Sequence, residues 1–201
     1  MIKAIFLDFE GVLTTEGSIV RNILYPKLRE YATLDELRKM YEDARCGKLA
    51  LADAFFKIPV EKLLKISNEI KAKKGAGRLL EELHEKNEIY LASNHIPLIF
   101  EKAVGNLKIK KYFKKIFVSF EMKTNKPNKE FFEIMLKETN YSPSECVFVD
   151  DSKTNLLTAK EMGFITIWFN NKDDNSRNKI EFNADYDVKT LKELAELINK
   201  L

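Results

Sequence analysis

Carboxylate side chains stand at the ends of two apolar stretches of this chain. Asp8 and Glu10 follow the apolar run 4–7, and the pair Asp150 and Asp151 follows a second such run. Apolar runs of this kind predict strands that are buried on both faces. The carboxyl ends of such strands form the edge at which open α/β sheets bind ligands. Because several carboxylates at one edge repel one another, we expect a metal cation or a proton-transfer task there.

The first of these stretches combines two carboxylates with a glycine. Period-two alternation places Asp8 and Glu10 on the same side while the chain stays extended. Gly11 permits a tight turn with backbone close to a ligand. The alternative interpretation is a strand followed by a solvated acidic turn, and this stretch by itself leaves both open.

Uncharged and basic groups are predicted at the same edge. Ser93 and Asn94 follow the apolar run 89–92, and Lys126 stands before Pro127, which is expected to preset the start of a helix. A hydroxyl and an ammonium group would then converge with four carboxylates. Hard oxygen ligands in near-octahedral array suit Mg²⁺.

Apolar runs alternate with helical patterns through most of the chain, which favours a parallel sheet covered on both faces. The predicted fold class is therefore α/β, with a doubly wound, Rossmann-like parallel sheet. The predicted strands are 4–7, 89–92, 116–118, 146–149 and 165–168. The predicted helices between and after them are one that stops at Asn87 and others at 97–104, 131–139, 156–162 and 191–201.

The block from about residue 19 to 74 has helical spacing and no strand signal. Thr33 and Glu36 fit a capping box that begins one of its helices. Short linkers at 15–18 and 73–77 border the block. We therefore expect a small helical cap inserted after the first strand. The predicted domains are an α/β core of residues 1–15 and 75–201 and a helical cap of residues 16–74.

The composition is that of a globular chain with little charge bias. The chain has 201 residues, of which 45% are hydrophobic and 32% charged, and its net charge is +3. This charge is too small to argue for nucleic acid, and the lysines between 108 and 115 predict a solvated helix face. No apolar run of about 18 residues is present, so no transmembrane helix is expected. The start of the chain lacks a signal pattern, so a cytoplasmic location is expected.

Cysteines, histidines and most aromatic residues are given structural interpretations. Cys46 and Cys146 lack metal-ligand spacing and are expected to be free thiols. His84 and His95 are interpreted as structural or surface residues. His95 is the better functional candidate, because it neighbours Ser93. Aromatic residues of the helical block, Tyr41 among them, are expected in its core, with one or two facing a substrate.

Four motifs, in this order along the chain, resemble those of the haloacid dehalogenase superfamily. They are Asp8-Phe9-Glu10-Gly11-Val12, Ser93 after a buried strand, Lys126 before a proline, and the acidic pair Asp150-Asp151. The resemblance covers about residues 1–14 and 75–169, and the helical block would be the small cap.

This resemblance implies a phosphatase that acts on a small phosphorylated metabolite. Asp8 would attack phosphorus and become an aspartyl phosphate. Glu10 would protonate the leaving oxygen and then activate water. Ser93 and Asn94 would hydrogen-bond phosphoryl oxygens, and Lys126 would neutralise charge on the phosphate and on Asp8.

The resemblance also implies a metal ion and a class of partner. Mg²⁺ would bridge Asp8, the backbone carbonyl of Glu10 and Asp151, with Asp150 supporting or ligating. The expected partner is a phosphorylated small molecule, without nucleic acid or membrane, and the protein would be a monomer or homodimer.

Glu10 departs from the aspartate that is commoner in the first motif. The superfamily's dehalogenases lack a carboxylate there, which argues against dehalogenation. Asp-x-Glu-Gly and the segment 19–26 resemble enolase-phosphatases of methionine salvage, whereas the second and fourth motifs resemble general sugar- or metabolite phosphatases. A phosphotransferase or mutase and a non-catalytic binding protein on this fold are further alternatives. A receiver-like signalling domain is disfavoured, because such domains have no helical block after the first strand, whereas this sequence predicts one.

Overall fold

The computed structural model describes residues 2–15, 17–170 and 180–201. At its centre is a six-stranded parallel sheet with the order β3-β2-β1-β4-β5-β6. The strands are β1 (Ala4–Leu7), β2 (Glu88–Ser93), β3 (Lys115–Val118), β4 (Cys146–Asp150), β5 (Ile165–Phe169) and β6 (Tyr186–Val188). The predicted doubly wound parallel sheet is confirmed, and β6 is an additional edge strand that the sequence analysis did not predict.

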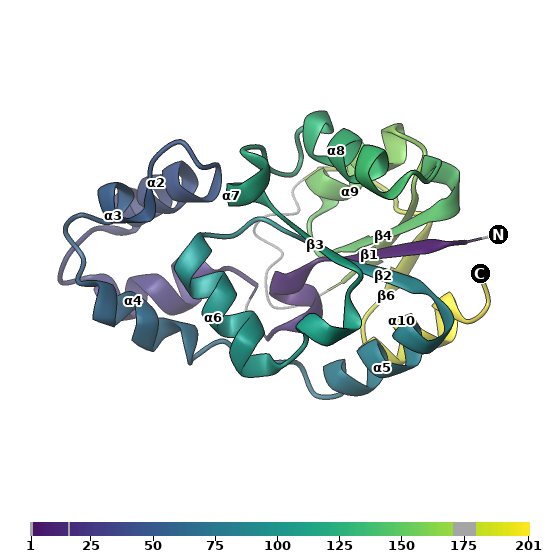
Figure 1. Ribbon diagram of the computed structural model, residues 1–201, viewed down its shortest axis with the longest axis horizontal. Coiled ribbons are helices and arrows are strands. Elements are labelled where there is room, and N and C mark those ends of the chain that lie inside the picture. Colours follow the sequence, from purple (N-terminus) through teal and green to yellow (C-terminus); the bar gives the residue numbers. More distant parts are fainter. Residues whose placement is uncertain (1, 16, 171–179) are drawn as a thin grey trace.

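Helices cover both faces of this sheet, with α8 and α9 on one face and α5 and α10 on the other (Figure 1). β1 shows why two layers are needed, because its side chains are buried on both sides. Ile5 and Leu7 belong to one hydrophobic core and Phe6 to the other, and all three are 0% exposed. The helices that flank the sheet are α5 (Ala76–Lys86), α6 (Pro97–Leu107), α7 (Ser119–Met122), α8 (Lys129–Thr139), α9 (Lys153–Glu161) and α10 (Leu191–Ile198), with short turns η3 (Lys110–Tyr112) and η4 (Pro143–Glu145).

Residues 17–74, here called the helical segment, lie beyond the carboxyl ends of the strands (Figure 1). Their elements are η2 (Val20–Leu24), α1 (Tyr25–Leu28), α2 (Leu34–Arg45), α3 (Leu51–Ala54) and α4 (Val60–Ser67). The predicted capping box begins α2. Thr33 Oγ1 accepts the Glu36 N–H over 3.3 Å, and Glu36 Oε2 accepts the Thr33 N–H over 2.8 Å.

The two connections between the helical segment and the sheet run side by side and form an antiparallel bridge. The Thr15 N–H donates to the Lys71 carbonyl over 3.0 Å, and the Lys73 N–H donates to the Leu13 carbonyl over 2.8 Å. The Lys73 ammonium also donates to the Gly11 carbonyl over 2.7 Å. The linkers are therefore joined to each other and to the turn that follows β1.

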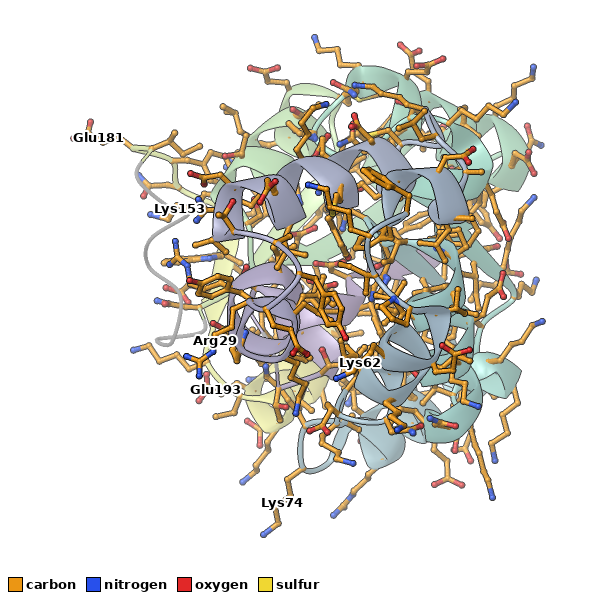
Figure 2. The ribbon with its side chains drawn as sticks, turned by 90° about the vertical axis from the view of Figure 1, so that its left-hand side faces the viewer. Arg29, Lys62, Lys74, Lys153, Glu181 and Glu193 are labelled. Carbon is orange, nitrogen blue, oxygen red and sulfur yellow. The ribbon has the colours of Figure 1, made fainter. Side chains whose placement is uncertain are left out.

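Neither a disulfide nor a membrane-spanning helix occurs among the described residues. Cys46 and Cys146 are buried free thiols, as predicted. No helix in the described parts of the chain is both long and apolar to the degree that crossing a membrane requires. Charged side chains such as Lys74 and Glu181 extend outward when the molecule is viewed from the end that carries the helical segment (Figure 2).

Candidate active site

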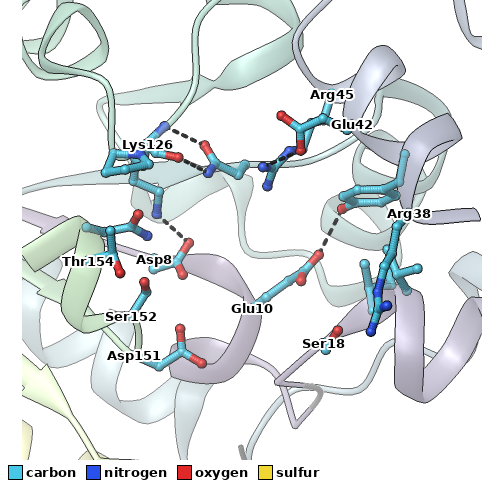
Figure 3. Close-up of a pocket in the computed structure, with 16 residues that line it drawn as sticks. Asp8, Glu10, Ser18, Arg38, Glu42, Arg45, Lys126, Asp151, Ser152 and Thr154 are labelled. Atoms are coloured by element: carbon cyan, nitrogen blue, oxygen red, sulfur yellow. Dashed lines mark hydrogen bonds and ion pairs between the residues drawn. The ribbon is translucent and has the colours of Figure 1, made fainter. Parts of the chain in front are cut away.

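A cavity of about 500 Å³ lies between the carboxyl ends of the strands and the helical segment (Figure 3). Five of the predicted site residues line it, namely Asp8, Glu10, Asn94, Lys126 and Asp151. Polar residues of the helical segment line the opposite side, namely Ser18, Arg38, Tyr41, Glu42 and Arg45. The cavity therefore lies where parallel α/β sheets bind their ligands.

Lys126 lies between two buried carboxylates at the base of the cavity. Its Nζ atom is 2.9 Å from Asp8 Oδ1 and 2.7 Å from Asp150 Oδ2, and it also donates to the Ala92 carbonyl over 2.7 Å. Burial alone would lower the pKa of Lys126, but the Asp150 and Asp8 carboxylates raise it. Burial raises the pKa of Asp8 to about 6, against the opposing effect of Lys126. The ammonium group is thus charged and adjacent to the Asp8 carboxyl.

Asp150 is fully buried and has a complete set of donors. It accepts the Ser152 N–H over 2.8 Å and the Lys126 ammonium over 2.7 Å. The Asn155 amide donates to both of its oxygens over 3.1 Å. Asp150 therefore holds Lys126 in place and fixes the start of α9.

Three carboxylates form an acidic cluster, which consists of Asp8, Asp150 and Asp151. One oxygen of each lies within 4.8 Å of the others. This donor set fits a hard divalent cation, because carboxylate oxygens are the ligands such ions prefer. The expectation of four converging carboxylates is corrected to three, because the Glu10 carboxyl lies outside the cluster and contacts Tyr41 instead.

The turn after β1, η1 (Phe9–Leu13), explains this separation. Asp8 is extended, with its Oδ1 accepting the Phe9 N–H over 2.8 Å. Gly11 then has a left-handed backbone with φ of 80°. The chain leaves the strand direction within this turn, so the side chains of Asp8 and Glu10 reach different parts of one cavity.

Among the described residues, the side chains of Tyr41 and His95 lie against the Glu10 carboxyl. The Tyr41 hydroxyl donates to Glu10 Oε1 over 3.1 Å (Figure 3). His95 Nε2 lies 3.3 Å from the same oxygen. Burial lowers the pKa of His95 to about 4, so its ring is neutral near pH 7.

The residues after β2 support the Lys126 loop. The Asn94 side chain donates to the Lys126 carbonyl over 2.8 Å and accepts the Lys126 N–H over 2.9 Å. Ser93 Oγ is buried without a hydrogen-bond partner among the described residues. The expected helix start at Pro127 is corrected, because α8 begins at Lys129. Asn94, rather than that helix, holds Lys126 at the cavity.

The family model of haloacid dehalogenase-like hydrolases matches residues 2–163. The chain belongs to this family. The hydrolase is 29% identical over 190 residues to D-ribitol-5-phosphate phosphatase of Bacteroides thetaiotaomicron, which covers 83% of this chain and 91% of that protein. It is 26% identical over 129 residues to pyrimidine 5'-nucleotidase PynA of Streptococcus pneumoniae, which covers 63% of this chain and 54% of that protein.

Solved structures of the family share the fold of this hydrolase. One is an enzyme of the haloacid dehalogenase (HAD) family from Bacteroides thetaiotaomicron, which superposes with a TM-score of 0.74 at 23% identity. That structure is of an aspartate-to-alanine mutant in complex with magnesium and inorganic phosphate. The match covers 88% of this chain and 98% of that one. The HAD-hydrolase YfnB from Bacillus subtilis, bound to magnesium, superposes with a TM-score of 0.73 at 18% identity, over 98% of this chain and 99% of that one.

Sequence analysis did not assign two residues that contact the site of this hydrolase. His95 was set aside, although its position two residues after Ser93 was a usable signal. Tyr41 was placed in the core of the helical block, and its helical spacing gave no sign of a contact with Glu10. The Tyr41 contact depends on how the helical segment packs on the sheet, and the His95 contact depends on the direction of the turn after β1.

Proposed function

We propose that this hydrolase is a phosphatase that cleaves a small phosphate monoester through an aspartyl phosphate on Asp8. The observation that supports this most is the buried Lys126 ammonium, 2.9 Å from Asp8 Oδ1. A carboxylate can approach a phosphate dianion only where positive charge offsets the repulsion. Lys126 supplies that charge beside the attacking oxygen, and Asp150 keeps it there.

In the first step, a carboxylate oxygen of Asp8 bonds to phosphorus, and the bond between phosphorus and the ester oxygen breaks. Glu10 gives its proton to the departing oxygen, so the product leaves as an alcohol. Asp8 then carries the phosphoryl group, and Glu10 is a carboxylate. The Ser93 hydroxyl and the remaining Asn94 N–H are proposed donors to the phosphoryl oxygens.

In the second step, Glu10 accepts a proton from water while the water oxygen bonds to phosphorus. The bond between phosphorus and the Asp8 oxygen breaks, and inorganic phosphate is released. Asp8 and Glu10 return to their starting states, so one acid-base residue serves both steps.

The acidic cluster supports a Mg²⁺ site. Asp8, Asp151 and the backbone carbonyl of Glu10 would hold the ion, and Asp150 would support them. When bound, Mg²⁺ would offset the negative charge of the phosphoryl oxygens. The presence of magnesium in structures with the same fold is consistent with this proposal.

The helical segment is proposed as a cap domain, residues 16–74, over a core domain of residues 1–15 and 75–201. It would exclude bulk water from the cavity and select the substrate. Its contribution to the lining is mainly polar, through Ser18, Arg38 and Arg45. This lining favours a substrate whose alcohol portion carries hydroxyl groups.

The test is release of inorganic phosphate from a panel that includes D-ribitol 5-phosphate, a pyrimidine nucleoside monophosphate and 4-nitrophenyl phosphate. Each is assayed with Mg²⁺ and with a chelator. We expect metal-dependent release that Asp8→Asn abolishes and that Asp53→Asn, an exposed change on α3, leaves intact. Turnover by Asp8→Asn would remove Asp8 as the nucleophile, and transfer of phosphate to another alcohol would instead indicate a phosphotransferase.

A further inference from the structure

The Glu10 carboxyl lies against two donors from distant parts of the chain. The Tyr41 hydroxyl, on α2 of the helical segment, donates to Glu10 Oε1 over 3.1 Å. His95 Nε2, which follows β2, lies 3.3 Å from that same oxygen. Both contacts therefore influence the direction in which one carboxyl group points.

His95 Nε2 is fully buried and has no hydrogen bond of regular geometry among the described residues. The Ile96 N–H donates to Nδ1 over 2.9 Å, which requires a lone pair there and places the ring proton on Nε2. The other tautomer could donate to the Ile96 carbonyl, 3.1 Å from Nδ1. That tautomer would point the Nδ1–H of His95 at the Ile96 N–H. It would also direct the lone pair of Nε2 at the Glu10 carboxyl. The ring proton is therefore directed at Glu10.

Aromatic packing holds the His95 ring in this orientation. Its centroid lies 5.3 Å from that of Phe100, 6.0 Å from that of Tyr41 and 6.1 Å from that of Phe9. The His95 backbone N–H donates to Ser119 Oγ over 3.1 Å. A ring enclosed in this way is held in one orientation, and in that orientation Nε2 lies 3.3 Å from Glu10 Oε1.

We propose that Tyr41 and His95 are positioning residues that hold the Glu10 carboxyl for proton transfer. The inference rests on the proposed function, in which Glu10 is the acid and base. The Tyr41 hydrogen bond is formed, and a small turn of the carboxyl completes the His95 bond. Because Oε1 accepts from Tyr41 and, after that turn, from His95 as well, the transferable proton resides on Oε2. Tyr41 belongs to the helical segment, so alignment of Glu10 depends on the position of that segment.

A glutamate in this motif needs such support more than an aspartate does. The additional methylene adds a rotatable bond, and fixing a flexible side chain costs conformational entropy. Misplacing a reacting group by about 1 Å lowers a rate by about a hundredfold. Two donors on one oxygen limit the rotation of the Glu10 carboxyl and thereby its position in the cavity.

The experiment removes each donor while preserving the ring that carries it. Tyr41→Phe and His95→Phe delete the donor and retain the aromatic packing. His95→Gln restores an N–H near the Nε2 position and serves as the rescue variant. Tyr112→Phe and His84→Gln are matched controls, because these two residues contact each other away from the cavity. Thermal unfolding identifies the variants that are folded.

Each variant is assayed on an alkyl phosphate, whose leaving group needs a proton, and on 4-nitrophenyl phosphate, whose leaving group does not. We expect Tyr41→Phe and His95→Phe to lower kcat on the alkyl ester by about ten- to a hundredfold, with little change in KM. On 4-nitrophenyl phosphate the first step stays fast, so a burst of 4-nitrophenolate precedes slow phosphate release. His95→Gln should recover most of the lost rate.

A double-mutant cycle completes the test. In the Glu10→Ala background, Tyr41→Phe and His95→Phe should cause no further loss, because they act through Glu10. A further loss there would overturn the proposal, and so would an equal loss in the rate of the first, ester-cleaving step on both esters. If His95→Phe does not fold, the Tyr41→Phe arm decides. Wild-type activity that Asp8→Asn abolishes and Tyr41→Phe leaves unchanged overturns this inference alone, whereas an inactive wild type overturns the proposed function.

Discussion

Gly11 makes room for the Asp151 carboxylate. A Cβ atom at Gly11 would lie 2.1 Å from Asp151 Oδ2, far inside van der Waals contact, and the Gly11 backbone is left-handed with φ of +80°. The turn after β1 and the loop after β4 therefore meet at a point where neither can carry an additional atom. This contact sets the position of Asp151 in the acidic cluster.

Gly11→Ala is expected to lower both stability and activity. The left-handed backbone costs about 1–2 kcal/mol for an alanine, and the new methyl group displaces Asp151. Thermal unfolding and Mg²⁺-dependent phosphate release measure the two effects. Gly77→Ala is the matched control, because Gly77 lies in α5 with nothing within 4 Å of its added Cβ. There we expect a gain of up to about 1 kcal/mol, and equal behaviour of the two variants would contradict the argument.

Mg²⁺ is expected to stabilise the folded protein through the acidic cluster. At a concentration of about a hundred times its Kd, the ion should add about 2.7 kcal/mol. This corresponds to a rise in Tm of roughly 5–10 °C for a domain of this size. Asp151→Asn should remove most of the rise, and Asp53→Asn should retain it. A rise of the same size in both variants would place the ion elsewhere.

Lys126→Met should leave Asp8 and Asp150 buried without their cation. Breaking such a pair from one side costs about 3–5 kcal/mol, and we expect this loss in the free energy of unfolding, together with loss of turnover. Adding Asp150→Asn should recover part of the stability but none of the activity. Lys129→Met, at an exposed ion pair, should cost about 1 kcal/mol or less. Similar losses at both lysines would disprove the special role of Lys126.

Because of Glu88, the free energy of unfolding should depend on pH in the acid range. Hydrogen bonds from Lys114, Tyr141 and Tyr90 lower the pKa of Glu88 to about 2, from an ordinary value of 4.5. Because the folded-state pKa is the lower one, this contribution is complete above about pH 4.5 and is lost as the pH falls toward 2. Glu88→Gln should cost about 1–2 kcal/mol at neutral pH and flatten the profile between these values. Chemical denaturation from pH 2 to 7 measures the free energy of unfolding of both proteins. Glu133 is exposed, so Glu133→Gln is the control and should follow the wild type.

Much of the fold follows from local patterns in the sequence. The five apolar runs became strands because each is more apolar than the residues that flank it. β6 lacks such a run, since Tyr186 and Asp187 are exposed and only Val188 is buried. A short edge strand of this kind is selected by pairing with β5 rather than by its own composition.

The candidate site was predictable where it depends on strand ends. Asp8 and Asp151 follow directly after β1 and β4, so their proximity follows from the parallel pairing of those strands. The direction of Glu10 was not predictable, because Gly11 turns the chain and Tyr41 comes from the helical segment. Packing between segments distant in sequence decides such contacts, and no local period encodes it.

The paired connections at Thr15 and Lys73 restrict how the helical segment can move. Because these connections are hydrogen-bonded to each other, the helical segment is attached to the sheet at one place rather than at two separate ones. Lys73 also donates to the Gly11 carbonyl, so this attachment lies beside the turn that carries Glu10. The helical segment therefore meets that turn twice, once at this attachment and once through the hydrogen bond from Tyr41 to Glu10.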